Sequence, residues 1–346
     1  MKVLIVGGGI LGLSSGLLLS LEGLRVSVVT RNPQEATSWV AGGMLAPFSE
    51  GLEGDLLEFS YRSLREYPQF LHLVEDVSGQ KVYAQMDGIF RVVLEDEDHL
   101  IVKAQEYASR GYRTYVMEPH GELSKKVKAL ILYQEEGCVD AENLMDALLL
   151  STYRTGIPIQ VDEITRVELQ DGEVKKVDGI KGSYEADFYV FCTGVWTKEL
   201  FPLPIFPVKG QAIKVKEVSV ERVHYSRLSY IIPRNRYLYI GATSEVGVLD
   251  HGNTLEGLHQ LTEGAISILP ALAKAKLLST LYGYRPATPD EKPVFLWGKN
   301  FLLATGHHRN GILQAPITAQ IVRNYITRGE VDPFMKVFDG NRFEVK

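Results

Sequence analysis

Two apolar runs near the N-terminus, separated by a glycine cluster and an amphipathic segment, form the clearest pattern in the chain. Residues Lys2–Val6 are rich in Val and Ile, which predicts a buried parallel strand. Glycines at 7, 8, 9 and 12 follow, and residues 14–23 then carry leucines on one helical face. A second run, Arg25–Thr30, predicts another strand. The order strand, glycine turn, helix, strand predicts a βαβ unit.

Strands and helices alternate again in the second half of the chain. Asp140 precedes a segment with apolar positions on one helical face, and aspartate is a favoured N-cap residue. Residues 157–183 alternate between apolar and polar, with Asp171-Gly172 as the signal of a hairpin turn. Three more elements are expected: buried strands at 186–192 and 301–304, and a final helix at 312–326.

A different pattern occupies the middle of the chain. Residues 211–218, 230–233 and 237–242 alternate, so one face of each predicted strand meets solvent or a ligand. We therefore predict an α/β fold with two domains: a Rossmann-like nucleotide-binding domain and an α+β second domain on a mostly antiparallel sheet. The first is expected to be discontinuous, at 1–78, 137–203 and 283–346, and the second to comprise 79–136 and 204–282.

Composition and charge narrow the class of protein. The 346 residues carry 37 Lys+Arg and 43 Asp+Glu, a net charge of −6, which argues against nucleic-acid binding. The 2 cysteines, Cys138 and Cys192, favour a reducing, cytoplasmic setting. No window holds the ~18 consecutive apolar residues of a membrane span. The N-terminus lacks a small-x-small cleavage site, so we expect no secretory signal.

The glycine cluster matches the dinucleotide-binding fingerprint in its required context. Gly7 permits the tight turn, Gly9 lets a pyrophosphate approach the backbone, and Gly12 lets the helix pack on the strand. The N–H groups at the start of the helix then hold the phosphates. The fingerprint fits NAD, NADP and FAD equally. Arg31 occupies the position where an acid usually binds the ribose, and we expect it to contact the adenine or a phosphate instead. Whether the nearest downstream acid, Glu35, binds the ribose stays open at this point.

Motifs spread over nearly the whole chain resemble the glycine oxidase (thiazole-synthesis) branch of the D-amino-acid-oxidase-like flavoproteins. Besides the glycine cluster they are Ala-Gly-Gly-Met-Leu-Ala-Pro at 41–47, Pro-Val-Lys-Gly-Gln at 207–211, Tyr-Ile-Ile-Pro-Arg at 230–234, Gly-Tyr-Arg-Pro-Ala-Thr-Pro-Asp at 283–290 and Gly-His-His-Arg-Asn-Gly-Ile-Leu at 306–313. The resemblance implies that the nucleotide is FAD. We expect it to be non-covalent, because the family's cysteinyl attachment sites precede the Thr-Pro-Asp motif and residues 281–287 contain no cysteine.

The resemblance also assigns roles to single residues. It implies that Arg285 and Tyr230 bind the substrate carboxylate, and a planar guanidinium suits such a bidentate contact. Arg309 is implied at the rim of the site, with its backbone as an acceptor for the substrate amine. The residues alone leave alternatives open: a surface arginine for Arg285, a core or strand-face tyrosine for Tyr230, and a cap or surface residue for Arg309. The further set implied to contact FAD is Gly7, Gly9, Ile10, Gly12, Arg31, Ala41, Gly42, Gly43, Met44, Ile164, Thr193, Gly194, Trp196, His308, Arg309, Asn310, Gly311, Ile312 and Leu313.

We expect no metal site, because His307 and His308 have no carboxylate or cysteine nearby at a ligand spacing. The function implied is oxidative deamination of glycine, sarcosine and D-alanine, with O2 as acceptor and hydrogen peroxide as a product, in the supply of glycine imine to thiamine thiazole synthesis. No side chain is evident as an acid or base, so we expect the substrate amine to lose its proton before hydride transfer. A homo-oligomer, by analogy a tetramer, is also implied.

Three alternatives stay open at this point. A D-amino acid dehydrogenase using a quinone, or a sarcosine oxidase, shares the Arg-Pro and Thr-Pro-Asp motifs. An NAD(P)-dependent dehydrogenase shares only the N-terminal fingerprint. A non-catalytic nucleotide-binding module would share that fingerprint as well.

Overall fold

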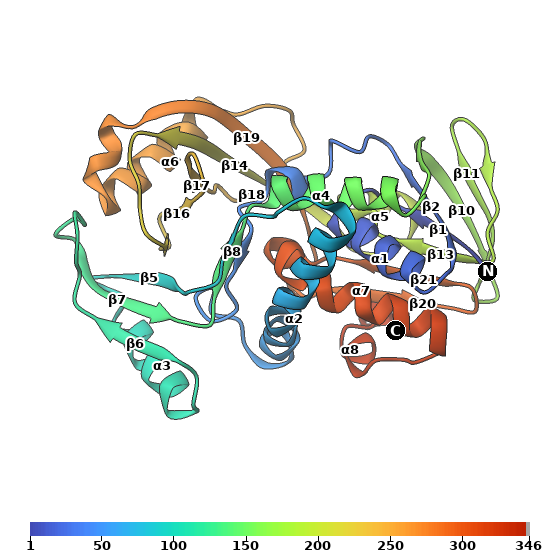
Figure 1. Cartoon of the computed structure of the whole chain (residues 1–346), viewed down its shortest axis with the longest axis horizontal. Helices are drawn as coiled ribbons and strands as arrows, with labels where there is room; N and C mark the ends of the chain where they lie inside the picture. The colour runs from blue at the N-terminus through green and yellow to red at the C-terminus, as the bar shows by residue number, and fades with distance from the viewer. Residues whose placement is uncertain (344–346) are drawn as a thin grey trace.

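The computed structural model describes residues 1–343 and divides its strands mainly between two sheets at opposite ends of an elongated molecule (Figure 1). One is a six-stranded sheet of order β20-β21-β13-β1-β2-β9. All neighbours in it are parallel except β20 and β21. The strands are β1 (Lys2–Val6), β2 (Arg25–Thr30), β9 (Ile159–Val161), β13 (Phe188–Phe191), β20 (Val294–Trp297) and β21 (Phe301–Thr305).

The central strand β1 is buried on both faces, as its apolar run predicts. Val3 and Ile5 pack in a core with Ile317 of α7 (Gly311–Arg328) and with residues of α8 (Pro333–Val337). Leu4 and Val6 point to the other face, where they join a core containing Val177. That face is covered by a three-stranded sheet of β10 (Ile164–Gln170), β11 (Glu173–Gly179) and β12 (Ser183–Tyr184). Parallel strands are stable only when both faces are covered in this way.

The expected hairpin turn and helix cap are both confirmed. Asp171 and Gly172 join β10 to β11 with φ values of 51° and 70°, the left-handed pair that a tight hairpin turn requires. Asp140 caps α4 (Ala141–Arg154), and its side chain accepts a hydrogen bond from the Asn143 amide over 3.3 Å.

Helix α1 (Ile10–Leu21) begins four residues before the expected start at Ser14. The turn at Gly7–Gly9 passes directly into the helix, so the first amides of α1 lie against the glycines rather than a turn later. Helices α1, α2 (Gly54–Ser78), α4 and α7 share one apolar core. In Figure 1, α2 lies near the middle of the molecule, and α1 and α7 overlap the six-stranded sheet.

The second large sheet has nine strands, of order β18-β14-β17-β16-β15-β5-β7-β6, with β19 paired to β14. Its pairs are antiparallel except β5 with β15, so the mostly antiparallel second sheet is confirmed. The strands are β5 (Ile89–Leu94), β6 (Thr114–Met117), β7 (Val127–Tyr133), β14 (Phe206–Lys216), β15 (Val223–Tyr225), β16 (Tyr230–Pro233), β17 (Leu238–Gly241), β18 (Glu245–Val246) and β19 (Lys276–Ala287).

Two helices pack on this sheet, and a small sheet lies between it and the first. Helix α6 (Leu255–Ile268) contributes Leu261 and Ile268 to the core of the nine-stranded sheet, and α3 (Asp98–Ser109) packs on its other end. The small sheet consists of β3 (Met44–Leu45), β8 (Gly137–Val139) and β4 (Ala84–Gln85). The domain boundary expected at residue 283 falls inside β19, whose 12 residues run continuously beside β14.

Candidate active site

A cavity of about 650 Å³ extends from the carboxyl ends of β1, β2 and β13 to the nine-stranded sheet. Its lining combines the glycine turn, the loop after β2, residues 40–44 and side chains of β16 and β19. This volume lies in the middle of the range for ligand pockets. The loops beyond the carboxyl ends of parallel strands are where open α/β sheets bind their ligands.

The glycine turn leaves no room for a side chain. Gly7 has φ +118°, and a Cβ there would lie 2.2 Å from the carbonyl oxygen of Cys192. A Cβ on Gly12 would lie 2.0 Å from the carbonyl oxygen of Gly7. Helix α1 has no side-chain cap at Gly9 and no acid in its first turn. The first amide of α1, at Ile10, donates to the Ser38 hydroxyl over 3.1 Å. The amides that follow it are suited to phosphate oxygens, so the residues present fit a dinucleotide.

The nucleotide end of the cavity contains acids that the sequence did not single out. The guanidinium of Arg31 lies 4.2 Å from the ring centroid of Trp196, and its Nε lies 3.5 Å from Glu163. Glu163 follows β9, which pairs with β2, and so its carboxylate reaches the same sheet edge as Arg31. Glu35, whose role was left open, also lines the cavity. Either carboxylate is placed to accept a hydrogen bond from a ribose hydroxyl.

Residues 40–44 cross the middle of the cavity and are held from the nine-stranded sheet. Arg234 donates a hydrogen bond to the Gly42 carbonyl oxygen over 2.6 Å, and Tyr239 donates one to the Val40 carbonyl oxygen over 2.8 Å. Gly43 has φ +63°, and a Cβ there would lie 2.0 Å from the Val139 carbonyl oxygen. The segment that includes Met44 is therefore fixed by contacts from both sides.

Arg285 and Tyr230 lie together at the opposite end of the cavity from the glycine turn. Arg285 is a residue of the long strand β19. Its Nη1 donates to the Thr243 carbonyl oxygen over 3.1 Å, which leaves other guanidinium N–H groups free for a ligand. Burial raises the pKa of Tyr230, and the nearby Arg285 opposes that shift. The tyrosine therefore remains a hydrogen-bond donor at neutral pH.

Two glycines on neighbouring strands, Gly210 and Gly241, leave room for these side chains. A Cβ on Gly210 would lie 2.4 Å from Nη2 of Arg285. A Cβ on Gly241 would lie 2.5 Å from the ring of Tyr230. The register that pairs Tyr230 with Gly241 thus creates the space that the phenol occupies.

A buried carboxylate, Glu50, completes this end of the cavity, and it was missed in the sequence. Its side chain is 6% exposed, and one oxygen lies 3.7 Å from Nε of Arg309. Burial raises the pKa of Glu50, against the lowering effects of Arg309, Arg285 and Arg91. The available signal was its position a few residues after the Ala-Gly-Gly-Met-Leu-Ala-Pro motif, which carries the chain into the cavity.

Most residues predicted to bind the cofactor or substrate line this one cavity. Gly12, Asn310 and Leu313 do not: Gly12 packs on Gly7, Asn310 is buried beside His307, and Leu313 lies in the helical core. The predicted residues in its lining are Gly7, Gly9, Ile10, Arg31, Ala41, Gly42, Gly43, Met44, Ile164, Thr193, Gly194, Trp196, Tyr230, Arg285, His308, Arg309, Gly311 and Ile312.

The two histidines before α7 are neutral at physiological pH. Burial lowers the pKa of His307 to about 3, and its Nε2 lies 2.9 Å from the hydroxyl of Thr318. Burial, with Arg309 and Arg285, lowers the pKa of His308 to about 4. Within residues 1–343, no three His, Cys, Asp or Glu side chains gather as metal ligands would.

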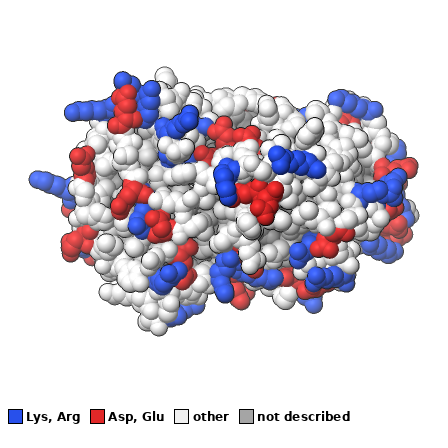
Figure 2. Space-filling view, viewed as in Figure 1, with Lys and Arg blue, Asp and Glu red and all other residues white. Residues whose placement is uncertain are grey.

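The distribution of surface charge and the apolar character of the helices are relevant to nucleic-acid and membrane partners. On the face shown in Figure 2, the described basic and acidic side chains are interspersed rather than gathered by sign. In the described part of the chain, no helix combines the length and apolar character needed to cross a membrane.

Comparison with known proteins shows which family the chain belongs to. The FAD dependent oxidoreductase family matches residues 2–325. The "Bifunctional protein ThiO/ThiG" of Trichormus variabilis is 35% identical over 360 residues, and the match covers 99% of this chain and 55% of that protein. The chain thus spans about half the length of that curated relative. A "Glycine oxidase" of Bacillus licheniformis is 27% identical, with 99% of this chain and 97% of the relative covered.

A solved structure agrees over the whole fold. The crystal structure of glycine oxidase from Bacillus cereus ATCC 14579 superposes with a TM-score of 0.88 at 26% identity, covering 97% of each chain. The match spans both large sheets and the cavity between them, as does the family match. The chain therefore belongs to the FAD dependent oxidoreductase family and resembles its glycine oxidases.

Proposed function

We propose that this protein binds FAD non-covalently and oxidatively deaminates glycine, sarcosine and D-alanine. The observation that carries the proposal is the placement of Arg285 and Tyr230 at the end of the cavity opposite the glycine turn. This arrangement supports a small amino acid held by its carboxylate beside the redox end of the dinucleotide. The products are an imine or 2-oxo acid, ammonia or an amine, and hydrogen peroxide from O2.

Each part of the cavity has a role in this reaction. The first amides of α1 and the Gly7–Gly9 turn hold the diphosphate, and the side chains around Arg31 and Trp196 hold the adenosine. Residues 41–44 border the ring system. FAD, when bound, supplies a hydride acceptor. Arg285 and Tyr230 fix the carboxylate and thereby orient the α-carbon. The start of α7, at Gly311 and Ile312, offers amides to negative charge at the cofactor.

The biological role proposed is the supply of glycine imine to thiamine thiazole synthesis, in the cytoplasm and as a homo-oligomer, by analogy a tetramer. The names of the ThiO/ThiG relatives support this role. A D-amino acid dehydrogenase or sarcosine oxidase is the second candidate, because the carboxylate anchor does not distinguish the electron acceptor or the amine substituent.

A visible spectrum of the purified protein is the first test. Flavin bands are expected, and their absence would favour the NAD(P)-dependent alternative. Acid precipitation should leave the yellow colour in the supernatant; colour retained in the pellet would mean covalent attachment. Peroxide release is then measured with glycine, sarcosine, D-alanine, D-proline and D-phenylalanine, with an artificial acceptor in parallel. Turnover only with the artificial acceptor, or a strong preference for D-proline or D-phenylalanine, would favour the second candidate.

A further inference from the structure

The carboxylate anchor and the Arg309 backbone, which the resemblance implies as an acceptor for the substrate amine, leave the proton of the ammonium group without a base to take it; this inference rests on the proposed function. A zwitterion held at Arg285 brings an ammonium group into a cavity with a mostly apolar lining. A buried charge without an opposite charge or hydrogen-bond acceptor is costly. The cavity therefore needs an acceptor at its substrate end, and one that can also take a proton, because only the neutral amine can supply the electron pair for oxidation.

Five carboxylates line the cavity in the described residues, and one of them lies at the substrate end. Glu35, Asp162, Glu163 and Glu199 belong to the segments around Arg31 and Trp196. Glu50 instead acts electrostatically with Arg285, Arg309 and Tyr230. It is thus the acid of this set that shares its surroundings with the carboxylate anchor.

The turn that carries Glu50 is held rigidly. The Glu50 amide donates to the Ala46 carbonyl oxygen over 3.1 Å, and the amides of Phe48 and Ser49 donate to the buried carboxyl of Glu136. Oε2 of Glu50 is buried and has no hydrogen-bond partner within residues 1–343. A fixed acceptor oxygen is therefore present at the substrate end with its hydrogen-bonding capacity unused.

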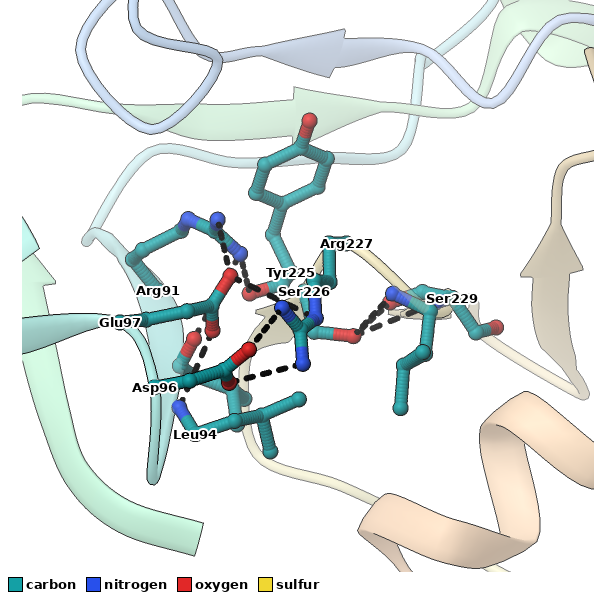
Figure 3. A network of polar contacts seen from close by, with 10 residues as sticks. Arg91, Leu94, Asp96, Glu97, Tyr225, Ser226, Arg227 and Ser229 are labelled. Carbon is teal, nitrogen blue, oxygen red and sulfur yellow. Dashed lines mark hydrogen bonds and ion pairs between the residues drawn. The ribbon is translucent and has the colours of Figure 1, made fainter.

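The charged and titratable groups around Glu50 come from five packed elements. Arg309 follows β21 in the η4 turn (His308–Asn310), Arg285 lies on β19, Arg91 on β5, and the tyrosines Tyr225 and Tyr230 on β15 and β16. Figure 3 shows Arg91 beside Tyr225 and paired with Glu97. Cζ of Arg91 lies 4.8 Å from the ring centroid of Tyr225, and its Nη2 lies 3.4 Å from Oε1 of Glu97. Glu97 offsets the charge of Arg91, whereas Arg285 forms no ion pair with an acid among residues 1–343 and remains for the substrate.

We propose that Glu50 binds the ammonium group of the substrate and accepts its proton before the α-carbon is oxidised. In this step an N–H bond breaks, its electron pair stays on nitrogen, and the proton bonds to a Glu50 oxygen, so no oxidant is consumed. Burial raises the pKa of Glu50, which makes its carboxylate a better proton acceptor than an exposed one. The neutral amine is then formed inside the cavity rather than drawn from solution.

The test separates recognition of the ammonium from recognition of the carboxylate. Glycolate has a hydroxyl in place of the ammonium of glycine, and its dissociation constant is measured at equilibrium from the visible spectrum of the oxidised holoenzyme. The dissociation constant and limiting rate for glycine come from anaerobic reduction kinetics between pH 6 and pH 10. The variants are Glu50→Gln and Glu50→Asp, with Glu58→Gln, an exposed position on α2, as the matched control.

In Glu50→Gln, glycine binding at pH 7 should weaken on the order of 10-fold to 100-fold, as expected for a lost hydrogen bond to a charged group. Glycolate binding should be retained or tightened. In this variant, the rate of flavin reduction by glycine should increase about tenfold per pH unit up to the pKa of the free amine. Glu50→Asp should fall between wild type and Glu50→Gln, and serves as the reporter if Glu50→Gln does not retain FAD. Glu58→Gln should match wild type.

Equal weakening of glycine and glycolate, or an unchanged pH profile, would overturn the inference and leave Glu50 as a structural partner of Arg309. A wild-type holoenzyme that no small amino acid reduces would overturn the proposed function itself, and the inference with it. The two failures are distinguishable, because the first requires a wild-type enzyme that glycine reduces.

Discussion

The guanidinium of Arg234 donates a hydrogen bond to the carbonyl oxygen of Gly42 over 2.6 Å, and so ties the nine-stranded sheet to the segment that borders the cofactor end of the cavity. Arg234 also lies 3.6 Å from Asp140, the N-cap of α4, and its own side chain is 1% exposed. One buried cation therefore connects the nine-stranded sheet, the segment 40–44 of the cavity wall and helix α4.

Replacing Arg234 with alanine should destabilise the protein and weaken FAD binding together. Removing one partner of a buried ion pair costs about 3 kcal/mol or more, because the other charge stays buried. Urea denaturation of the apoprotein and titration with FAD measure the two effects. The matched control is Arg236→Ala, two residues away and exposed. Loss of stability with unchanged FAD affinity would mean that Gly42 is positioned without Arg234.

Gly7→Ala should abolish FAD binding, because its Cβ would lie 2.2 Å from the Cys192 carbonyl oxygen. Gly23→Ala is the control, since Gly23 also has a positive φ, +78°, but nothing lies within 4 Å of its Cβ position. That variant should lose only about 1 kcal/mol from backbone strain and keep its flavin. The flavin-to-protein absorbance ratio of each purified variant provides the measurement. A yellow Gly7→Ala protein would contradict the proposed place of the diphosphate.

Arg285→Ala should lower kcat/KM for glycine on the order of 10² or more, mainly through KM, because a bidentate hydrogen-bonded contact is lost. FAD content should remain that of wild type. Arg285→Lys keeps the charge but not the planar pair of donors, so an intermediate value is expected. Steady-state kinetics measure these effects. The control is Arg323→Ala, which replaces an arginine of α7 that lies outside the cavity lining. An unaltered kcat/KM would remove Arg285 from the site.

Glu136 should make the protein less stable as the pH rises. Burial raises its pKa from 4.5 to about 8, so the folded state favours the protonated form. This contribution to the free energy of unfolding is full below pH 4.5 and is lost as the pH rises to about 8. His307 and His308 act oppositely, and mainly below pH 6.5, because their pKa values are lowered.

The comparison that isolates Glu136 is therefore wild type against Glu136→Gln, which cannot ionise. Unfolding in urea at pH 5, 7 and 8.5 should show the variant gaining stability relative to wild type as the pH rises. A difference that is constant across this range would mean that Glu136 does not titrate there in the folded protein.

Local patterns predicted the elements that depend on local physics. The glycine turn after β1 and the Asp171-Gly172 hairpin need backbone conformations that few residues adopt, and the Asp140 cap joins residues three positions apart. Helix α2 did not stand out in the sequence, because Pro68 lies inside its 25 residues and its stability comes from packing against α4 and α7.

The sequence by itself determined the nucleotide turn, the two kinds of sheet and, through the motifs, the residues expected at each end of the cavity. The tertiary structure alone decided which acids reach it. Glu163 meets Arg31 because β9 pairs with β2, and Glu50 meets Arg309 across 259 positions of the chain, held by a turn that Glu136 supports. Such contacts depend on strand order and burial, and neither property is encoded in the spacing of nearby residues.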